Sequence, residues 1–364
     1  MARLFEDVPR CFQSMTRKTL KVGLIGAGGI AREVHLPGWK AMDDAQLTAV
    51  CDNNPAAAKE ISKSFEIPHV FTDFREMLRL DLDCVDICTP NRFHAPVALA
   101  ALNSGKHVLC EKPLAVTTEE VLALADASRK NGRILMTAQH FRFTDKITAL
   151  KNYVATGAAG DFYHARVYAM RRNLLPVSPG FLDPALSGGG PCMDIGVHAL
   201  DAAMYLMGFP KPVRVTGNTA VHFAKGHDIP GAWGEWDRQL FGVEDFASGF
   251  VHFENGATMA LEASWLGHQK EAEDMSFMLF GKKGSVTWPL NEIYSCTNGA
   301  FVTEQVSPAR KLQPPHTEEI FAFAKAIREN LPSPVPVEET LRVIAILEGI
   351  YRSAEAGKEI ILNL

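Results

Sequence analysis

The hydrophobic pattern of the first part of the chain alternates between short apolar runs and longer amphipathic stretches. Amphipathic segments with helical periodicity, such as 55–65 and 95–105, separate the apolar runs. The apolar runs have the length of buried strands and occur at 20–25, 46–51, 84–88, 107–110 and 134–139, with a shorter one near residue 70. Repeated strand–helix units of this length predict an α/β fold built on a doubly wound parallel sheet with right-handed crossovers.

The pattern changes from about residue 160 onward. Longer runs rich in β-branched and aromatic residues follow one another, with turn signals such as "FENGAT" and "FGKKGSV" between them. Helical periodicity returns at 316–330 and 337–358. This half predicts an α+β domain with a large, mainly antiparallel open sheet. We therefore expect an N-terminal extension at 1–19, a nucleotide-binding domain at 20–141 and a substrate-binding and oligomerisation domain at 142–364, whose last helices could pack back on the first domain.

Composition narrows the function classes. The 364 residues are 47% hydrophobic and 22% charged, with a net charge of -5, which is typical of a globular protein with ample core and not of a nucleic-acid binder. The sequence contains no apolar run of membrane-spanning length, and its start lacks the apolar core of a secretion signal. The seven cysteines form no CxxC pair or zinc-like cluster. A cytoplasmic protein with reduced thiols and no metal is expected.

A glycine-rich turn follows the first strand. The stretch Gly26-Ala27-Gly28-Gly29-Ile30-Ala31 has the form G-x-G-x-x-A, which permits a tight turn, a close approach to a pyrophosphate and close helix packing. A plain strand–helix turn is the alternative, but the second strand ends at Asp52, where a carboxylate can bind ribose hydroxyls. Because that carboxylate would repel a 2'-phosphate, the sequence favours NAD over NADP. The predicted cofactor contacts from this region are Gly26, Gly28, Gly29, Ile30, Asp52 and Asn53.

Further polar residues follow the ends of later strands, at the edge where such sheets bind ligands. The loop "TPNRFH" follows one strand and Glu111-Lys112-Pro113 follows the next. Lys112 could be a solvated loop charge, but its place at this edge favours a functional role. We expect the cofactor to be contacted also by Thr89, Pro90, Asn91, His94, Glu111 and Lys112.

The stretch "GGGPCMDIGVH", residues 188–198, carries the candidate proton chemistry. On a helix, Asp194 and His198 would lie one turn apart on the same face. An isolated pair of this kind is more often structural, and a zinc site is a poorer interpretation because no nearby Cys/His cluster completes a ligand set. The glycines at 188–190 are expected to bring the backbone close to the cofactor or the sugar.

The segment 224–243 holds Trp233, Trp236 and Phe241 among glycines and charges. It could be a lid whose rings stack on a sugar, or a loop held by packing or by a subunit contact.

Together, the glycine turn with Asp52, the "TPNRFH" loop, "EKP" and "GGGPCMDIGVH" resemble the glucose-fructose oxidoreductase / inositol dehydrogenase / rhizopine catabolism (Gfo/Idh/MocA) family from about residue 20 to the end. The resemblance implies an NAD(P)-dependent enzyme acting on a secondary alcohol of a sugar or cyclitol. Carried over by motif, it implies that Lys112, Asp194 and His198 are catalytic and that Arg171 and Asn173 of "MRRN" reach substrate hydroxyls. Cys192 departs from the small or aliphatic residue usual at that position.

The oxidation of an alcohol requires residues of these types. Oxidising an alcohol requires removal of its proton, which a histidine can accept, and a lysine cation stabilises the developing alkoxide. We expect His198 to act as the base, Lys112 to polarise the oxygen, and Asp194 to orient both. Two alternatives stay open: an enzyme that holds and recycles NAD while it cleaves or epimerises a glycoside, and a non-catalytic NAD- and sugar-binding sensor. A homodimer or homotetramer packed through the second domain is also expected, since a one-sided sheet needs cover.

Overall fold

A computed structural model describes residues 19–364, so the predicted extension at 1–19 lies almost wholly outside the described residues. The first half forms a six-stranded sheet in the order β3-β2-β1-β4-β5-β6, and every neighbouring pair is parallel. Its strands are β1 (Leu20–Ile25), β2 (Ala45–Cys51), β3 (His69–Phe71), β4 (Cys84–Ile87), β5 (His107–Glu111) and β6 (Leu135–Ala138). This confirms the predicted doubly wound parallel sheet.

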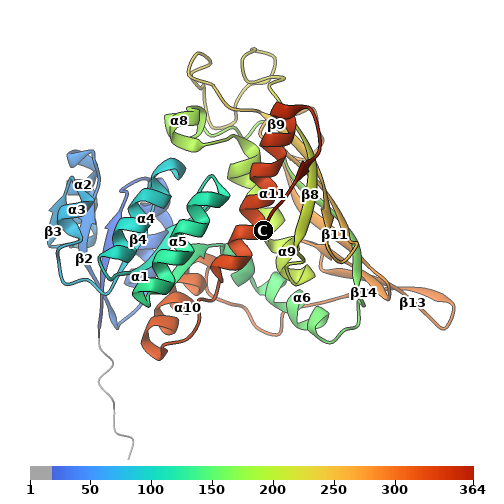
Figure 1. The fold of residues 1–364 in the computed structure, drawn as a ribbon, viewed down its shortest axis with the longest axis horizontal. Coiled ribbons are helices and arrows are strands. Elements are labelled where there is room, and N and C mark those ends of the chain that lie inside the picture. The colour runs from blue at the N-terminus through green and yellow to red at the C-terminus, as the bar shows by residue number, and fades with distance from the viewer. Residues whose placement is uncertain (1–18) are drawn as a thin grey trace, which may run out of the picture.

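Helices cover both faces of this sheet, as Figure 1 shows at its left. The first helix contains a π-helical turn at Ala31–His35, followed by α1. The helices are α1 (Leu36–Lys40), α2 (Pro55–Phe65), α3 (Phe74–Met77), α4 (His94–Asn103) and α5 (Thr118–Asn131).

The second half forms a nine-stranded sheet in the order β14-β13-β12-β11-β7-β10-β9-β8-β15. All neighbours are antiparallel except β7 and β10, so the predicted mainly antiparallel sheet is confirmed. Its strands are β7 (Phe162–Arg171), β8 (Pro212–Ala220), β9 (Phe246–Phe253), β10 (Thr258–Ser264), β11 (Glu273–Gly281), β12 (Gly284–Trp288), β13 (Glu292–Thr297), β14 (Ala300–Gln305) and β15 (Ile360–Ile361).

Helices pack on the side of the large sheet that faces the first domain (Figure 1). Those in contact with the sheet are α6 (Asp145–Ala155), α9 (Val197–Met207) and α11 (Val337–Ala356). The other helices of this half are α7 (Pro179–Leu182), α8 (Pro184–Ser187) and α10 (Pro315–Glu329). Helix α11 lies between α5 and the large sheet. Helix α10 packs on the first domain, where Ile320 and Phe323 join a buried cluster with Val22, Leu24 and Trp39.

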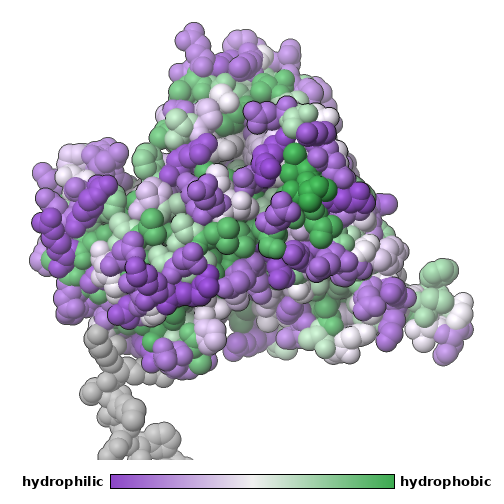
Figure 2. All heavy atoms as spheres, in the orientation of Figure 1, coloured by the Kyte–Doolittle hydropathy of each residue, from purple (hydrophilic) through white to green (hydrophobic). Residues whose placement is uncertain are grey.

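The visible surface is mostly hydrophilic, with an apolar area over the C-terminal strand β15 beside α11 (Figure 2). Ile361 of that strand is 59% exposed. No helix among residues 19–364 is long and apolar enough to cross a membrane.

A buried ion cluster ties the two domains together. The Arg142 guanidinium donates two hydrogen bonds of 2.7 Å to Asp201 on α9 and a further one to Glu339 on α11. Its flat face lies over the rings of Tyr205 and Phe209. Since Arg142 follows β6 directly, the cluster fixes the first sheet relative to the helices that begin near the site.

Replacing Asp201 with asparagine should therefore destabilise the fold. The guanidinium would stay buried with one carboxylate in place of two, which should lower the free energy of unfolding by about 3 kcal/mol. Urea unfolding followed by circular dichroism measures this, with Asp126→Asn, at an exposed pair on α5, as the control. A loss below about 1 kcal/mol, as for a surface pair, would contradict the assignment.

Candidate active site

Lys112 and Asp194 meet where the two domains face each other. Lys112 follows β5 directly, and its Nζ donates to Asp194 Oδ1 at 3.0 Å and to the Asp194 carbonyl at 2.9 Å. The second carboxylate oxygen, Oδ2, accepts a hydrogen bond of 3.1 Å from the indole of Trp265. Both charged side chains are largely buried. An ion pair held in this way keeps the ammonium group fixed at the carboxyl end of the parallel sheet.

His198 lies one helical turn beyond Asp194, and its side chain is almost fully buried. The ring stacks on Phe141 with centroids 5.1 Å apart and meets His140 edge-on at 4.8 Å. Its Nδ1 is buried and has no hydrogen-bond partner among residues 19–364. Burial, reinforced by the charges of Lys112 and His140, lowers the pKa of His198 well below its ordinary value of 6.5. The imidazole is therefore neutral at neutral pH.

The carboxylate of Asp194 does not orient His198 in the way the sequence suggested. Within residues 19–364 no hydrogen bond joins the two side chains. The carboxylate binds Lys112 and Trp265 instead, with a nitrogen of Arg171 4.0 Å away. The physical reason is charge: a buried carboxylate is better stabilised by a cation than by a neutral imidazole. Asp194 thus positions the lysine, while aromatic packing holds the histidine.

The glycines at 188–190 serve close packing within the protein, which corrects the expectation that they approach cofactor or sugar. A Cβ on Gly188 would meet Val116 at 2.5 Å, and one on Gly189 would meet the hydroxyl of Tyr351 at 2.3 Å. A Cβ on Gly190 would lie 2.1 Å from the Glu244 carbonyl. The buried Glu244 carboxylate also accepts the backbone N–H groups of Gly190 and Cys192. The glycines therefore allow a buried carboxylate to hold the start of the helix that carries Asp194 and His198.

The glycine turn after β1 fits a dinucleotide phosphate. Gly26 has φ +99°, and a Cβ there would meet the Cys88 carbonyl at 2.5 Å, so only glycine fits. In contrast, nothing lies within 4 Å of the positions that a Cβ would take on Gly28 and Gly29. Both are exposed, as are Ile30, Asn53 and Pro90. The open backbone at the start of a helix is what a pyrophosphate needs.

Asp52 stands at the end of β2 beside this turn. Its Oδ2 accepts the N–H of Ala27 at 2.7 Å, and its Oδ1 accepts the N–H of Asn54 at 2.8 Å. The carboxylate is partly exposed, so it can also accept hydrogen bonds from the hydroxyls of a ribose. A nearby hydroxyl, Thr89 Oγ1, is buried and has no partner within the described residues. These groups fit a bound dinucleotide.

Two of the predicted cofactor residues act on the protein itself. The buried Glu111 accepts the N–H of Lys112 at 2.9 Å and lies 2.8 Å from Nε2 of His35. Burial alone would raise the pKa of Glu111, but the hydrogen bond and charge of His35, together with Lys112, lower it to about 2. Both carboxylate oxygens are thus engaged, which places Glu111 under the lysine as a support rather than against a cofactor.

Both ring nitrogens of His94 also have partners within the protein. Its Nδ1 lies 2.7 Å from the Pro113 carbonyl and its Nε2 lies 2.7 Å from the Thr89 carbonyl, and the ring is buried. The imidazole joins the loop after β4 to the loop after β5, so neither nitrogen is free for a ligand. Asn91 donates to the carbonyl of Ser187 at 2.8 Å and connects the same loop to α8.

Arg171 is the last residue of β7 and Asn173 follows that strand, but their side chains have different partners. Arg171 approaches Asp194, donates to Glu273 at 2.7 Å and lies 5.0 Å from the ring of Trp233. Asn173 donates to the Pro230 carbonyl at 3.1 Å. Of these two residues, it is Arg171 for which a contact with Asp194 is found within residues 19–364.

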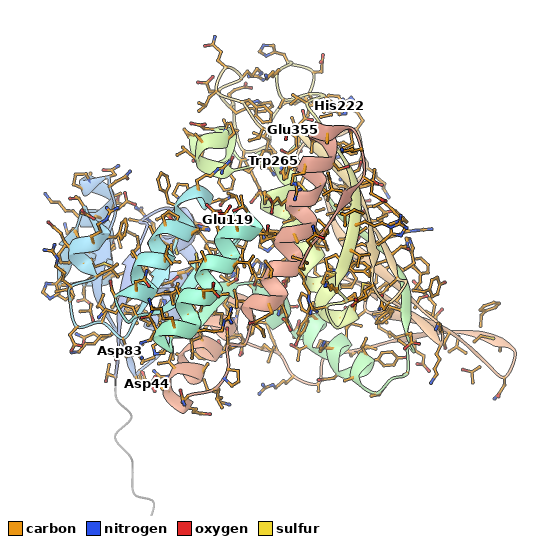
Figure 3. All side chains as sticks on the ribbon, viewed as in Figure 1. Asp44, Asp83, Glu119, His222, Trp265 and Glu355 are labelled. Atoms are coloured by element: carbon orange, nitrogen blue, oxygen red, sulfur yellow. The ribbon has the colours of Figure 1, made fainter. Side chains whose placement is uncertain are left out.

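Sequence reasoning did not assign Trp265 or His316 to the site. Trp265 follows β10 and is fully buried; Figure 3 labels it in the upper half of the second domain. His316, at the start of α10, stacks on His140 with centroids 4.0 Å apart. Trp265 could have been suspected because its strand pairs in parallel with β7 and ends at the same edge as Arg171. No local signal marks His316, which reaches the site through the packing of α10.

Comparison with known proteins agrees with this geometry. Residues 20–139 match the model of an oxidoreductase family with an NAD-binding Rossmann fold, and residues 147–287 match the GFO/IDH/MocA C-terminal domain. The chain is 33% identical to D-glucoside 3-dehydrogenase of Escherichia coli (strain K12), over 95% of this chain and 99% of that protein. It is 31% identical to levoglucosan dehydrogenase of Pseudarthrobacter phenanthrenivorans, over 74% of each.

Solved structures agree as well. A levoglucosan dehydrogenase in complex with NADH superposes with a TM-score of 0.80 at 26% identity, over 94% of this chain and 99% of that one. An oxidoreductase domain protein from Kribbella flavida gives 0.82 at 24% identity, over 95% and 100%, and supports the fold. The chain therefore belongs to the Gfo/Idh/MocA family, and it is an NAD(P)-dependent oxidoreductase that acts on CH–OH groups of sugars.

Proposed function

We propose that the protein oxidises a secondary alcohol of a glycoside, sugar or cyclitol and transfers the hydride to NAD. The observation that carries this proposal is the fixed Lys112 ammonium beside the buried, neutral His198, at the carboxyl edge of a dinucleotide-binding sheet. The relatives named for glucosides and for levoglucosan support a glycoside as substrate. No metal is required, because a lysine cation stabilises the developing alkoxide.

Each residue has one task in this scheme. Nicotinamide, when bound, supplies the hydride acceptor. The Lys112 ammonium donates a hydrogen bond to the reacting oxygen and stabilises its negative charge. His198 accepts the hydroxyl proton. Asp194 and Trp265 hold the lysine in place, and Arg171 is close enough to bind a neighbouring hydroxyl.

We propose NAD rather than NADP as the working cofactor. The Asp52 carboxylate is stabilised by two backbone N–H groups and would lie at the ribose, where it repels a 2'-phosphate.

The test compares kcat/KM for NAD and NADP over a panel of glycosides, aldoses and cyclitols, and identifies the product by mass spectrometry. A product lacking two hydrogen atoms supports the proposal. A cleaved or epimerised glycoside without NADH release would support a recycled cofactor, and binding without turnover would support a sensor.

The pH dependence of oxidation follows from the state of His198. Because burial lowers the pKa of this base below 6.5, the imidazole stays neutral as the pH falls through 6.5 and gains a proton only under that value. Initial rates at saturating NAD should therefore give a kcat/KM for the sugar that is level down to pH 6.5 and declines below it. An acid limb centred above pH 6.5 would contradict the assignment of His198 as the base.

We also propose a homodimer or homotetramer packed through the large sheet. Its helices lie on one face, and the other face carries Phe250, Phe280 and Tyr163 beside Arg166 and Glu262. Analytical ultracentrifugation at micromolar concentration should show an oligomer. Phe250→Glu should shift the equilibrium toward the monomer; a monomeric wild-type protein would overturn the idea.

A further inference from the structure

A pocket of about 570 Å³ opens at the ends of β7 and β10, lined by residues that follow Arg171 and Trp265 in the chain. That volume is in the range of small-molecule sites. Its walls come from three segments that are distant in sequence and lie side by side: the end of β7, the loop after β8 and the turn after β10. The lining residues are Arg172, Asn173, Asp228, Ile229, Pro230, Gly267, His268 and Gln269.

Backbone contacts fix this pocket relative to the catalytic residues. Asn173 forms an isolated β-bridge with Leu266, the neighbour of Trp265, whose indole binds Asp194. The carbonyl of Asn173 accepts the N–H of Ala232 at 2.9 Å, which ties the loop after β8 to the same edge. The pocket thus begins within a few residues of the group that binds Lys112.

Arg171 contacts both Asp194 and Trp233, and Trp233 belongs to the loop after β8 that helps to line the pocket. Its guanidinium lies 4.0 Å from the Asp194 carboxylate and 5.0 Å from the ring of Trp233. A hydrogen bond to Glu273 holds it there. Trp236 and Phe241 from the same loop are buried in the core, so the loop 224–243 is anchored by packing, whereas Trp233 is 50% exposed. The Trp233 indole is therefore partly exposed beside Arg171.

The lining of the pocket suits a polyhydroxylated ring. Arg172, Asn173 and Gln269 already donate to main-chain carbonyls. Asp228 and His268 form no hydrogen bond with the residues that the structure describes, so an acceptor and an imidazole stay open. Both side chains are exposed, and the opposite charges of Arg172 and Asp228 in the lining favour neither an anion nor a cation. A sugar ring offers hydroxyls to both and an apolar face to Ile229, Pro230 or the exposed indole.

We propose that this pocket is a subsite for a second sugar ring, and that the preferred substrates are disaccharides or glycosides with a sugar aglycone. The inference rests on the proposed function: the ring to be oxidised lies at Lys112 and His198, and its glycosidic partner extends past Arg171 into the pocket. The subsite takes no part in the hydride step; it contributes binding energy from a remote part of the substrate.

The test compares maltose and cellobiose with methyl α- and methyl β-glucoside. Titration calorimetry on the NADH-loaded protein measures Kd, and initial rates give kcat/KM for each sugar. One of the disaccharides should bind about tenfold more tightly than its methyl glycoside. Trp233→Ala and Asp228→Asn should each remove most of that advantage. Phe301→Ala is the matched control, since Phe301 is an almost fully exposed aromatic on β14, in the hairpin that projects from the far side of the large sheet (Figure 1).

The outcomes separate this inference from the proposed function. Suppose that methyl glucosides are oxidised. If both disaccharides bind no more tightly than the methyl glucosides, or if Trp233→Ala and Asp228→Asn weaken the binding of disaccharides and methyl glucosides equally, the subsite is wrong and the proposed dehydrogenase activity stands. If a disaccharide binds tightly through Trp233 and Asp228 while no sugar is oxidised, the subsite stands and the proposed reaction is wrong.

Discussion

Replacing His198 with asparagine should lower kcat for sugar oxidation about 10²- to 10⁴-fold, the usual contribution of a general base. The asparagine amide fills much of the same space but cannot accept a proton. The imidazole is suited to the task because burial keeps it neutral at neutral pH, the form that accepts a proton. Its ring is held by Phe141 and His140 rather than by a hydrogen bond. The substitution should therefore leave the binding of NAD unchanged, since the glycine turn and Asp52 are untouched.

Stopped-flow measurement of NADH formation at saturating sugar gives kcat free of binding effects. The matched control is His69→Asn, on the exposed edge strand β3, which should retain wild-type kcat. The pH profile gives a second readout: the variant should lose the decline below pH 6.5 that titration of His198 causes. A His198→Asn enzyme with kcat within threefold of wild type would require another base.

Replacing Lys112 with methionine should lower kcat about 10²- to 10³-fold, comparable to the removal of one oxyanion donor. Methionine keeps the length of the side chain and removes the charge that stabilises the alkoxide. The change also leaves the buried carboxylate of Asp194 with only the Trp265 indole and the more distant Arg171. An unpaired buried carboxylate is costly, so the variant should also unfold at a lower urea concentration.

A double variant separates the two effects. Lys112→Met with Asp194→Asn removes both charges, so stability should recover toward wild type while kcat stays low. Lys358→Met, an exposed lysine after α11, is the control for the loss of a lysine. Recovery of kcat in the double variant would show that Lys112 acts only by neutralising Asp194, which would contradict its role at the reacting oxygen.

The sequence was sufficient to predict both sheets, and the family resemblance implied that Lys112 and Asp194 share one site. Strand periodicity locates the end of β5, and the carboxyl edge of a parallel sheet is where ligands bind, so Lys112 could be placed without side-chain coordinates. The helical spacing likewise placed Asp194 and His198 on one face. These predictions rest on local patterns and on general rules of topology.

The partners of the side chains could not be predicted in the same way. Glycines 188–190 signalled a close approach, but not that Val116, Tyr351 and Glu244 are the approaching groups. Glu111 and His94 follow strand ends as expected, yet they bind His35 and main-chain carbonyls rather than a ligand. Each contact depends on how separate elements pack, and a periodic pattern carries no information about that packing.

The Trp-rich loop shows the same limit. Its composition allowed either a ring that stacks on a sugar or loop packing. In the structure, the tryptophans of the loop differ in their burial and in their partners. Trp236 donates to the Ala224 carbonyl inside the core, while Trp233 lies against Arg171 at the surface. The two tryptophans are three residues apart, so composition alone could not distinguish them.

The central claim is that the Lys112–Asp194 pair and His198 together drive net oxidation of a sugar by NAD. The most direct test follows the near-ultraviolet absorbance of NADH while the wild-type protein, His198→Asn and Lys112→Met are each mixed with NAD and a panel of glycosides and polyols. The account predicts sugar-dependent NADH formation by the wild type and its loss in both variants, although NAD still binds. Tight NAD binding by the wild type with no NADH formed from any sugar would contradict it.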